Sequence, residues 1–163
     1  MNLTNLIPQS LKDTIYVRLF GFLKVPLIFY VAPKVITMND DVCEIKIPLN
    51  RRTKNHLKSM YFGVLCTGAD IAGGLIAMNE IEKSKQNIAL SFKDFHADFL
   101  KRAHGDVHFK CVQGKEIKSF VDEVIKSKER MNFNVMIEAT VPSLPEDGVV
   151  AKFSLTLSLK VKS

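Results

Sequence analysis

The clearest chemical signal in the sequence is a single carboxylate inside a long apolar run. Residues 59–79 contain no charged side chain except that of Asp70. A carboxylate is costly to bury unless it is paired, hydrogen-bonded or used, because desolvation raises its pKa. The same desolvation prepares an acidic side chain to act as a general base or nucleophile. We therefore take Asp70 as the first candidate catalytic residue. A structural carboxylate bonded to nearby backbone N–H groups is the alternative.

The apolar run itself predicts a long buried helix. It contains no proline, and its glycines (Gly63, Gly68, Gly73 and Gly74) would let a sheet approach the helix closely. Its length also fits a membrane span, and basic residues precede it. However, a charge at a bilayer centre is costly, and the neighbouring amphipathic strands need a partner to bury against. We therefore expect a core helix and no stable membrane span.

The N-terminal segment, residues 3–23, repeats apolar residues every four positions. Leu11, Ile15, Leu19 and Leu23 fall on one side of a helix with this spacing. The pattern predicts an amphipathic helix whose apolar stripe packs on the domain. A helix lying on a membrane surface is the alternative, although its polar side is not notably rich in Lys and Arg.

Two-residue alternation predicts most of the remaining elements. We expect a hairpin over residues 29–49 with its turn at 39–41, strands over 92–100 and 106–112 joined by a short turn, a helix over 114–129, and a long antiparallel hairpin over 131–161. An antiparallel sheet covers a helix on several sides only if it curls around it. The sequence therefore predicts an α+β fold in which a curled antiparallel sheet wraps around a long central helix, with an extra N-terminal helical region. We expect one domain over residues 1–163, with 1–27 as the helical extension and 28–163 as the core.

Charge and cysteine usage limit the classes of partner and the compartment. The net charge of +6 favours an anionic partner, and the dispersed cations favour a phosphate-bearing small ligand over nucleic acid. Cys43, Cys66 and Cys111 are widely spaced with no CxxC pair, as in the reduced core cysteines of a cytoplasmic protein. Residues 1–9 lack the basic region of a secretory signal. We expect a cytoplasmic protein with no metal site and no cofactor.

Two motifs carry a resemblance to a known family. Asn55 is followed six residues later by Tyr61-Phe62-Gly63, and Asp70 lies seven residues after Gly63. This spacing is similar to that of the asparagine, the His-Gly-Gly turn and the helix carboxylate of hotdog-fold thioesterases, especially the phenylacetate-type acyl-CoA thioesterase branch. The segment DFLKRAHGD, residues 98–106, resembles the NFLRPAxGG strand–turn–strand of that family. The resemblance covers the chain from about residue 29 onward. It departs from the family at Tyr61 and Phe62, which stand in place of His and Gly.

The resemblance implies a hotdog fold and an acyl-CoA thioesterase. In such an enzyme Asp70 would act as general base on water or as nucleophile. Asn55 would position the water or the carbonyl, and the N–H group of Gly63 would serve as an oxyanion donor. Thr67, one helical turn before Asp70, would brace the carboxylate.

The resemblance also indicates how substrate would be held. Tyr61 would pack close to the site, and Phe62 would fill or narrow the acyl pocket. Lys101 and Arg102 are the first candidates to contact the phosphates of coenzyme A, and the pair Arg51-Arg52 is the second. The implied partner is acyl-CoA or an acyl-carrier thioester.

Assembly and alternative functions follow from the same resemblance. Hotdog domains build their sites across a two-fold interface, which implies a homodimer or a dimer of dimers. The alternative function is a non-catalytic acyl-binding or dimerisation module on the same fold. A hydratase of this fold is a third possibility, but the paired Asp and His of that branch are not evident in the sequence.

Overall fold

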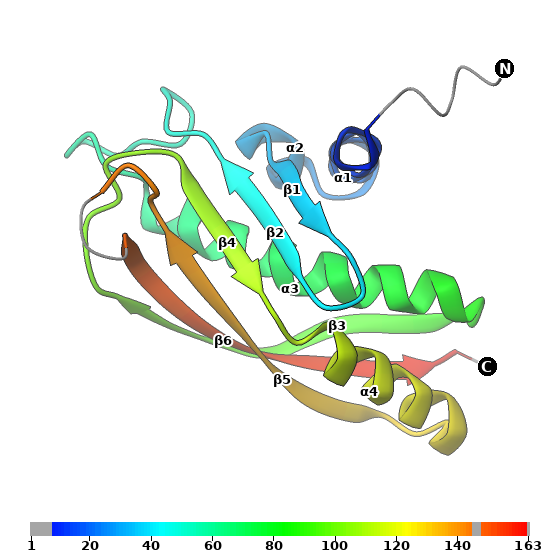
Figure 1. Cartoon of the computed structure of the whole chain (residues 1–163). Helices are drawn as coiled ribbons and strands as arrows, with labels where there is room; N and C mark the ends of the chain where they lie inside the picture. Colours follow the sequence, from blue (N-terminus) through cyan, green and yellow to red (C-terminus); the bar gives the residue numbers. More distant parts are fainter. Residues whose placement is uncertain (1–7, 145–147, 163) are drawn as a thin grey trace, which may run out of the picture.

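Six antiparallel strands curl around one long helix (Figure 1). The computed structural model describes residues 8–144 and 148–162. In chain order the elements are α1 (Gln9–Lys24), α2 (Pro26–Val31), β1 (Lys34–Met38), β2 (Cys43–Ile47), α3 (Phe62–Ser84), β3 (Ile88–Phe99), β4 (Val107–Cys111), α4 (Gly114–Ser127), β5 (Met131–Thr140) and β6 (Val149–Val161). The strand order is β1-β2-β4-β5-β6-β3, and all neighbours are antiparallel. The predicted α+β architecture, with a curled sheet around a central helix, is confirmed.

Helix α3 is apolar because it forms the centre of the core. It is long and apolar enough to cross a membrane, but 67% of that apolar window is buried inside the domain. The alternating inward side chains of β2, β4, β5 and β6 cover it, as the fully buried Ile45, Phe109, Ile137 and Leu155 illustrate. Burial against the sheet therefore accounts for the apolar composition of this helix.

Two glycines of α3 allow the helix backbone to approach the sheet. A Cβ atom at Gly68 would lie 2.3 Å from the ring of Phe109, and one at Gly73 would lie 3.3 Å from Ile137. Gly74 differs, because a Cβ there would meet only the ring of Phe92, at an ordinary 3.8 Å. The expected close approach is thus present, and it is tightest at Gly68.

The strands predicted in the second half of the chain are present, but two of them pair differently from a simple strand–turn–strand unit. β5 and β6 form the predicted long antiparallel hairpin. β3 pairs with β6, whereas β4 lies between β2 and β5. The short connection between β3 and β4 therefore crosses from one edge of the curled sheet to its interior. It does not form a hairpin.

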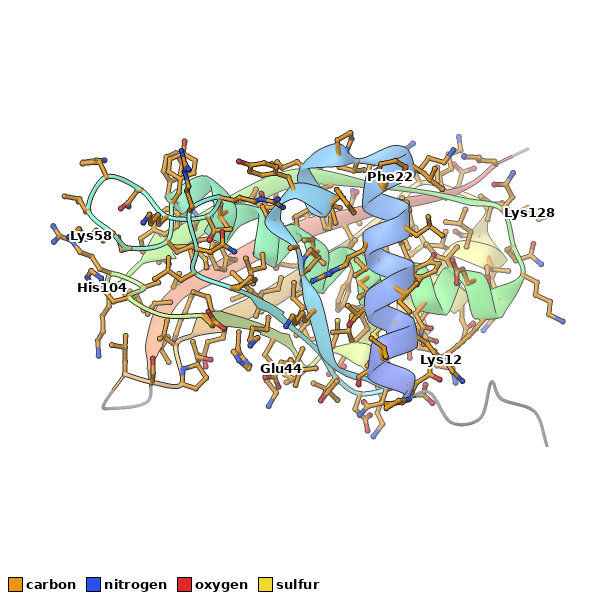
Figure 2. The ribbon with its side chains drawn as sticks, turned by 90° about the horizontal axis from the view of Figure 1, so that it is seen from above. Lys12, Phe22, Glu44, Lys58, His104 and Lys128 are labelled. Atoms are coloured by element: carbon orange, nitrogen blue, oxygen red, sulfur yellow. The ribbon has the colours of Figure 1, made fainter. Side chains whose placement is uncertain are left out.

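The apolar stripe of the N-terminal helix faces outward, so the predicted packing of this stripe is wrong. Leu11, Ile15, Leu19 and Leu23 are between 49% and 63% exposed. Figure 2 shows α1 crossing the outside of the molecule, with Lys12 near one end and Phe22 near the other. The first part of the predicted helix, residues 3–7, lies outside the described residues.

Helix α1 packs through smaller residues instead. Its buried positions are Thr14, Val17 and Gly21. The hydroxyl of Thr14 accepts a hydrogen bond from the N–H of Val35, at 2.9 Å, and this contact covers the outer edge of β1. A Cβ at Gly21 would lie 2.6 Å from the backbone nitrogen of Phe29, so glycine permits the close contact between α1 and α2.

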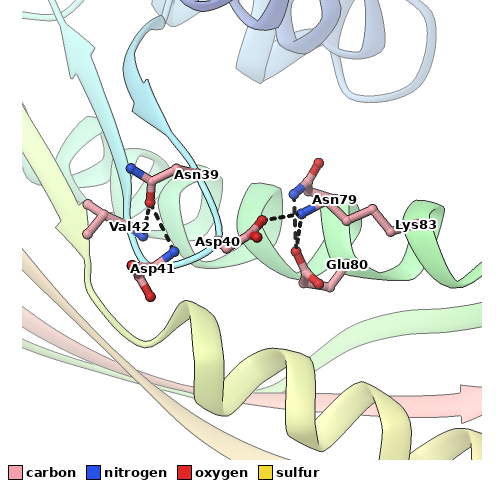
Figure 3. Close-up of polar contacts among 7 residues, drawn as sticks. All are labelled: Asn39, Asp40, Asp41, Val42, Asn79, Glu80 and Lys83. Carbon is pink, nitrogen blue, oxygen red and sulfur yellow. Dashed lines mark hydrogen bonds and ion pairs between the residues drawn. The ribbon is translucent and has the colours of Figure 1, made fainter.

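A polar network ties the turn between β1 and β2 to α3 (Figure 3). Lys83 Nζ lies 2.7 Å from Asp40 Oδ1 and 2.7 Å from Glu80 Oε1. Asn79 Nδ2 also donates to Glu80 Oε1, and Asn39 Oδ1 shapes the turn by accepting two backbone N–H groups. Because Glu80 is only 5% exposed, Lys83 and Asn79 supply the partners that its buried carboxylate requires.

We expect Gly68→Ala to destabilise the protein and Gly74→Ala to stabilise it. The added methyl group at position 68 meets the buried ring of Phe109, and such overpacking outweighs the gain in helix propensity, for a net loss of roughly 1–2 kcal/mol. At position 74 the methyl group fits, so the propensity gain of about 0.5–1 kcal/mol remains. Urea unfolding followed by circular dichroism measures both. Equal shifts for the two variants would contradict the assigned contact of α3 with the sheet.

Candidate active site

Asp70 faces a cavity between the N-terminal helices, α3 and β3. The cavity has a volume of about 220 Å³, and among the described residues that line it Asp70 alone is charged. The other lining residues are Tyr16, Val17, Phe20, Val25, Ile28, Ile71, Gly74, Leu75, Met78, Leu90, Ser91 and Phe92. A single carboxylate therefore lies in a wall that is mostly apolar.

The Asp70 carboxylate has no hydrogen-bond or ion-pair partner among the described residues. Burial raises the pKa of Asp70 above the ordinary value of 3.8. The predicted brace from Thr67 is wrong, because the Thr67 hydroxyl donates to the Gly63 carbonyl at 2.8 Å. No hydrogen bond joins Asp70 to a backbone N–H group among the described residues, so the alternative of a structural carboxylate held by such groups has no support either. Asp70 is therefore free to interact with a bound molecule.

A second cavity, of about 350 Å³, lies at the N-terminus of α3. Most of the other predicted site residues line this cavity: Asn55, Tyr61, Phe62, Lys101 and Arg102. Leu65 and Phe99 add apolar surface. Arg51 and Arg52 line neither cavity, and the Arg52 guanidinium lies over the ring of Tyr30, 5.6 Å from its centroid.

The Asn55 side chain shapes the loop that leads into α3. Its Oδ1 accepts the N–H groups of Leu57 and Ser59, at 2.9 and 3.2 Å. Its Nδ2 donates to the hydroxyl of Ser59 at 3.1 Å. Both ends of the amide thus have partners within the loop, which is typical of an Asx turn.

Gly63 lies in the first turn of α3, where N–H groups have no acceptor within the helix. The N–H groups of Val64 and Leu65 both donate to the carbonyl of Tyr61. The N–H group of Gly63 comes one residue earlier in this turn. The Tyr61 ring stands over Gly63, because an added Cβ would lie 2.6 Å from it. The Tyr61 and Phe62 rings are 4.8 Å apart, and together they form an aromatic wall beside this turn.

The two parts of the predicted site are separated along the helix. Gly63 and Asp70 are seven residues apart, and a rise of about 1.5 Å per residue puts roughly 10 Å between them. No residue in the described part of the chain lines both cavities. Within one chain, therefore, the structure does not bring Asp70 together with Asn55 and Gly63 around a single reacting atom.

Some residues of the Asp70 cavity were not predicted from the sequence. Tyr16 and Ser91 are polar residues in its wall that no motif indicates. Tyr16 donates a hydrogen bond to Glu82, and burial together with this carboxylate raises the pKa of Tyr16 to about 12. In residues 8–144 and 148–162, no group of three or more His, Cys, Asp or Glu side chains could hold a metal ion.

Solved structures share this fold at low sequence identity. A Shewanella oneidensis protein, provisionally assigned as a thioesterase, superposes with a TM-score of 0.74 at 11% identity, covering 93% of this chain and 99% of that one. A Chlorobaculum tepidum protein of unknown function has a TM-score of 0.80 at 12% identity, covering 94% and 97%. A Pseudomonas aeruginosa protein, also of provisional thioesterase assignment, has a TM-score of 0.76 at 17% identity, covering 91% and 96%. At these identities the likeness shows the fold.

The sequence comparisons identify the family. Among curated proteins, none matches the chain. The family described as "Domain of unknown function" (DUF4442) matches residues 15–158, which run from within α1 to near the end of β6. The protein therefore has the hotdog fold and belongs to the DUF4442 family.

Proposed function

We propose that the protein hydrolyses acyl thioesters, with Asp70 as general base or nucleophile. The observation that carries this proposal is the unpartnered Asp70 carboxylate in the wall of an apolar cavity. An apolar cavity suits an acyl chain, and a desolvated carboxylate of raised pKa suits proton abstraction or attack on a thioester. Two of the three solved structures described above carry a provisional thioesterase assignment, which supports the same class of reaction.

The proposed site is completed by a second copy of the chain across the outer edge of β3. Within the described residues β3 pairs only with β6, whereas α1 covers the corresponding edge of β1. Aromatic side chains gather beside the open edge: Phe62, Phe95 and Phe99 are between 40% and 57% exposed. An unpaired twelve-residue edge next to exposed aromatic rings favours strand pairing with a partner.

Antiparallel pairing of β3 with its own copy would join the two cavities. β3 begins beside the Asp70 cavity, at Leu90–Phe92, and ends beside the second cavity, at Phe99. In an antiparallel pair the start of one strand lies opposite the end of the other. The Asp70 cavity of one protomer would then face the second cavity of its partner. Both cavities lie near or below the lower end of the roughly 300–1,000 Å³ that complete ligand sites occupy, as expected for half-sites.

This assembly gives each residue a role. The acyl chain would enter the cavity lined by Phe20, Ile28 and Ile71, which favours a medium or long chain over acetyl. The first turn of the partner's α3 would direct the Gly63 N–H at the carbonyl oxygen. Asp70 would take a proton from water as the water attacks the carbonyl carbon. The C–S bond then breaks, and the thiolate receives a proton.

Charges beside the second cavity suit the carrier end of the substrate. Lys101 and Arg102 line this cavity and are exposed. Their positive charge would contact the phosphates of coenzyme A or of a phosphopantetheine carrier. Tyr61 and Phe62 would form the wall between the thioester and these phosphates.

The structure also gives a reason to keep a non-catalytic acyl-binding module as the second candidate. The Asn55 amide is engaged by its own loop: its Oδ1 accepts two backbone N–H groups and one of its two Nδ2 hydrogens is donated to Ser59, which leaves one donor for a water molecule or a carbonyl. Tyr61 and Phe62 replace the His and Gly of the related motif. In this second candidate the same dimer and the same cavity would bind an acyl group without hydrolysing it.

The shared site predicts that two inactive variants complement each other. Asp70→Asn and Arg102→Glu impair opposite halves of the site, so each homodimer should be weak. A mixed dimer has one site with both halves intact, and random mixing should restore about a quarter of the wild-type kcat/KM. Subunit exchange followed by an acyl-CoA assay with thiol detection measures this. No recovery on mixing, or a monomer by light scattering at micromolar concentration, would contradict the shared site.

Asp70→Asn should lower the turnover of medium- and long-chain acyl-CoA by roughly 100-fold or more, because the substitution removes the base while keeping the side-chain volume. Asp122→Asn is the matched control, since it neutralises an exposed carboxylate on α4 and should leave turnover unchanged. Equal turnover in wild type and Asp70→Asn would rule out the mechanism. Acyl-CoA binding without hydrolysis in the wild type would establish the second candidate function.

The raised pKa of Asp70 predicts a characteristic pH dependence. Because Asp70 must be ionised to act, the acidic limb of kcat/KM should lie above pH 3.8, the ordinary aspartate value. The folded state binds the proton more tightly than the unfolded state, so Asp70 lowers the free energy of unfolding as pH rises through its raised pKa. Asp70→Asn should therefore gain stability relative to wild type between acidic and neutral pH, as thermal unfolding can measure. If the acidic limb of kcat/KM lay near pH 3.8, the catalytic carboxylate would have an ordinary pKa and the proposed role of the desolvated Asp70 would be contradicted.

A further inference from the structure

The outer surface of α1 and α2 exposes large apolar side chains that the other described residues leave largely uncovered, although the rings of Phe22 and Phe29 meet edge to face with their centroids 5.4 Å apart. Leu11, Ile15, Leu19, Phe22, Leu23 and Leu27 form this surface, here called the α1–α2 apolar surface, and each is between 49% and 63% exposed. The packing of α1 on the domain uses the other side of the helix, through Thr14, Val17 and Gly21.

These side chains lie together. Leu11, Ile15, Leu19 and Leu23 follow a spacing of four, and Phe22 lies beside them on the same side of the helix. Figure 2 shows α1 as a ridge across the outside of the molecule, with α2 next to it. Single exposed apolar residues are ordinary on a protein surface, whereas a continuous apolar ridge marks an interaction site.

The charges near this ridge are mainly positive. Lys12 and Lys24 of α1 are exposed, whereas Arg18 is half-buried and donates to the carbonyls of Ala32 and Pro33. The nearby acidic residues are Asp13, which accepts a hydrogen bond from Gln9, and Glu82, which accepts one from Tyr16. Arg52 adds a further cation, because its guanidinium lies over the ring of Tyr30 in α2. The whole chain has a net charge of +6. The apolar ridge therefore has a cationic rim.

We propose that the α1–α2 apolar surface docks the protein on an anionic membrane surface. A helix with an apolar face and neighbouring Lys and Arg side chains can insert that face at the boundary of head groups and acyl chains. Anionic head groups attract the cationic rim. A second copy of the chain fits this surface less well, because two identical cationic rims repel each other.

The surface also lies directly over the Asp70 cavity. Tyr16, Val17 and Phe20 of α1, with Val25 and Ile28, line that cavity from beneath the ridge. The same two helices would thus contact lipid on one side and the cavity on the other. In the proposed dimer the two-fold axis is perpendicular to the sheet at β3, so both ridges lie on the same face and can contact one membrane.

Membrane docking is separate from the proposed hydrolysis and can be tested without substrate. The full chain is floated with vesicles of phosphatidylcholine alone, or of phosphatidylcholine and phosphatidylglycerol in equal amounts. We expect binding to the anionic vesicles that weakens as salt is added. The double variant Leu19→Gln/Phe22→Gln removes two large apolar side chains from the ridge. Its affinity for the anionic vesicles should therefore fall by roughly tenfold or more.

A matched control separates this surface from apolar exposure in general. Val112→Gln/Met136→Gln changes two side chains that are 60% and 53% exposed but lie away from α1 and α2, after β4 and in β5, and this variant should bind like the wild type. Circular dichroism and thermal unfolding confirm that both variants fold. Absence of vesicle binding at low salt would overturn the proposal, as would unchanged binding by Leu19→Gln/Phe22→Gln. If that variant instead dissociates a wild-type oligomer in light scattering, the surface is an interface between copies. Equal binding to neutral vesicles would overturn the role of the cationic rim.

Discussion

At Gly68 the backbone of α3 lies against the ring of Phe109, with no space for even a methyl group. This contact holds the helix close to the concave side of the sheet, and the sheet curls to cover its flanks. Asp70 follows two residues later, about 200° around the helix, so it faces away from Phe109 and β4. The remaining side of α3 is closed by α1 and α2, which makes the Asp70 cavity a consequence of how the central helix packs.

The same constraint explains which parts of the fold could be predicted from the sequence. The C-terminal hairpin has one buried and one solvated side, so its residues alternate and identify β5 and β6 directly. The apolar run identifies α3 because this helix is buried along most of its length. The stripe on α1 misled the prediction, since periodicity locates an apolar face but does not say what it contacts. Thr14 and Gly21, which do contact the domain, carry little apolar signal.

The sequence identifies the individual residues of the candidate site more readily than their positions relative to one another. Composition alone singles out Asp70, because a carboxylate in an apolar run is costly unless it has a use. The motif spacing locates Asn55, Tyr61 and Gly63 around the start of α3, and they are found there. In one chain these residues do not reach Asp70, because the first and third turns of a helix are separated by roughly 10 Å along its axis. In the proposed dimer, the second protomer brings its own Asn55, Tyr61 and Gly63 to the Asp70 cavity of the first.

The N-terminal helices α1 and α2 have apolar residues on both their inner and their outer sides. Their inner side must be apolar to line the cavity, and it does so with Val17, Phe20 and Ile28. A helix that served only as a cavity wall would carry polar residues on its outer side, because exposed leucine and phenylalanine gain nothing from water. The outer side of α1 instead carries Leu19, Phe22 and Leu23. A helix that is apolar on both sides fits a position between two apolar environments. The Asp70 cavity is one of them, and in our proposal an anionic membrane is the other.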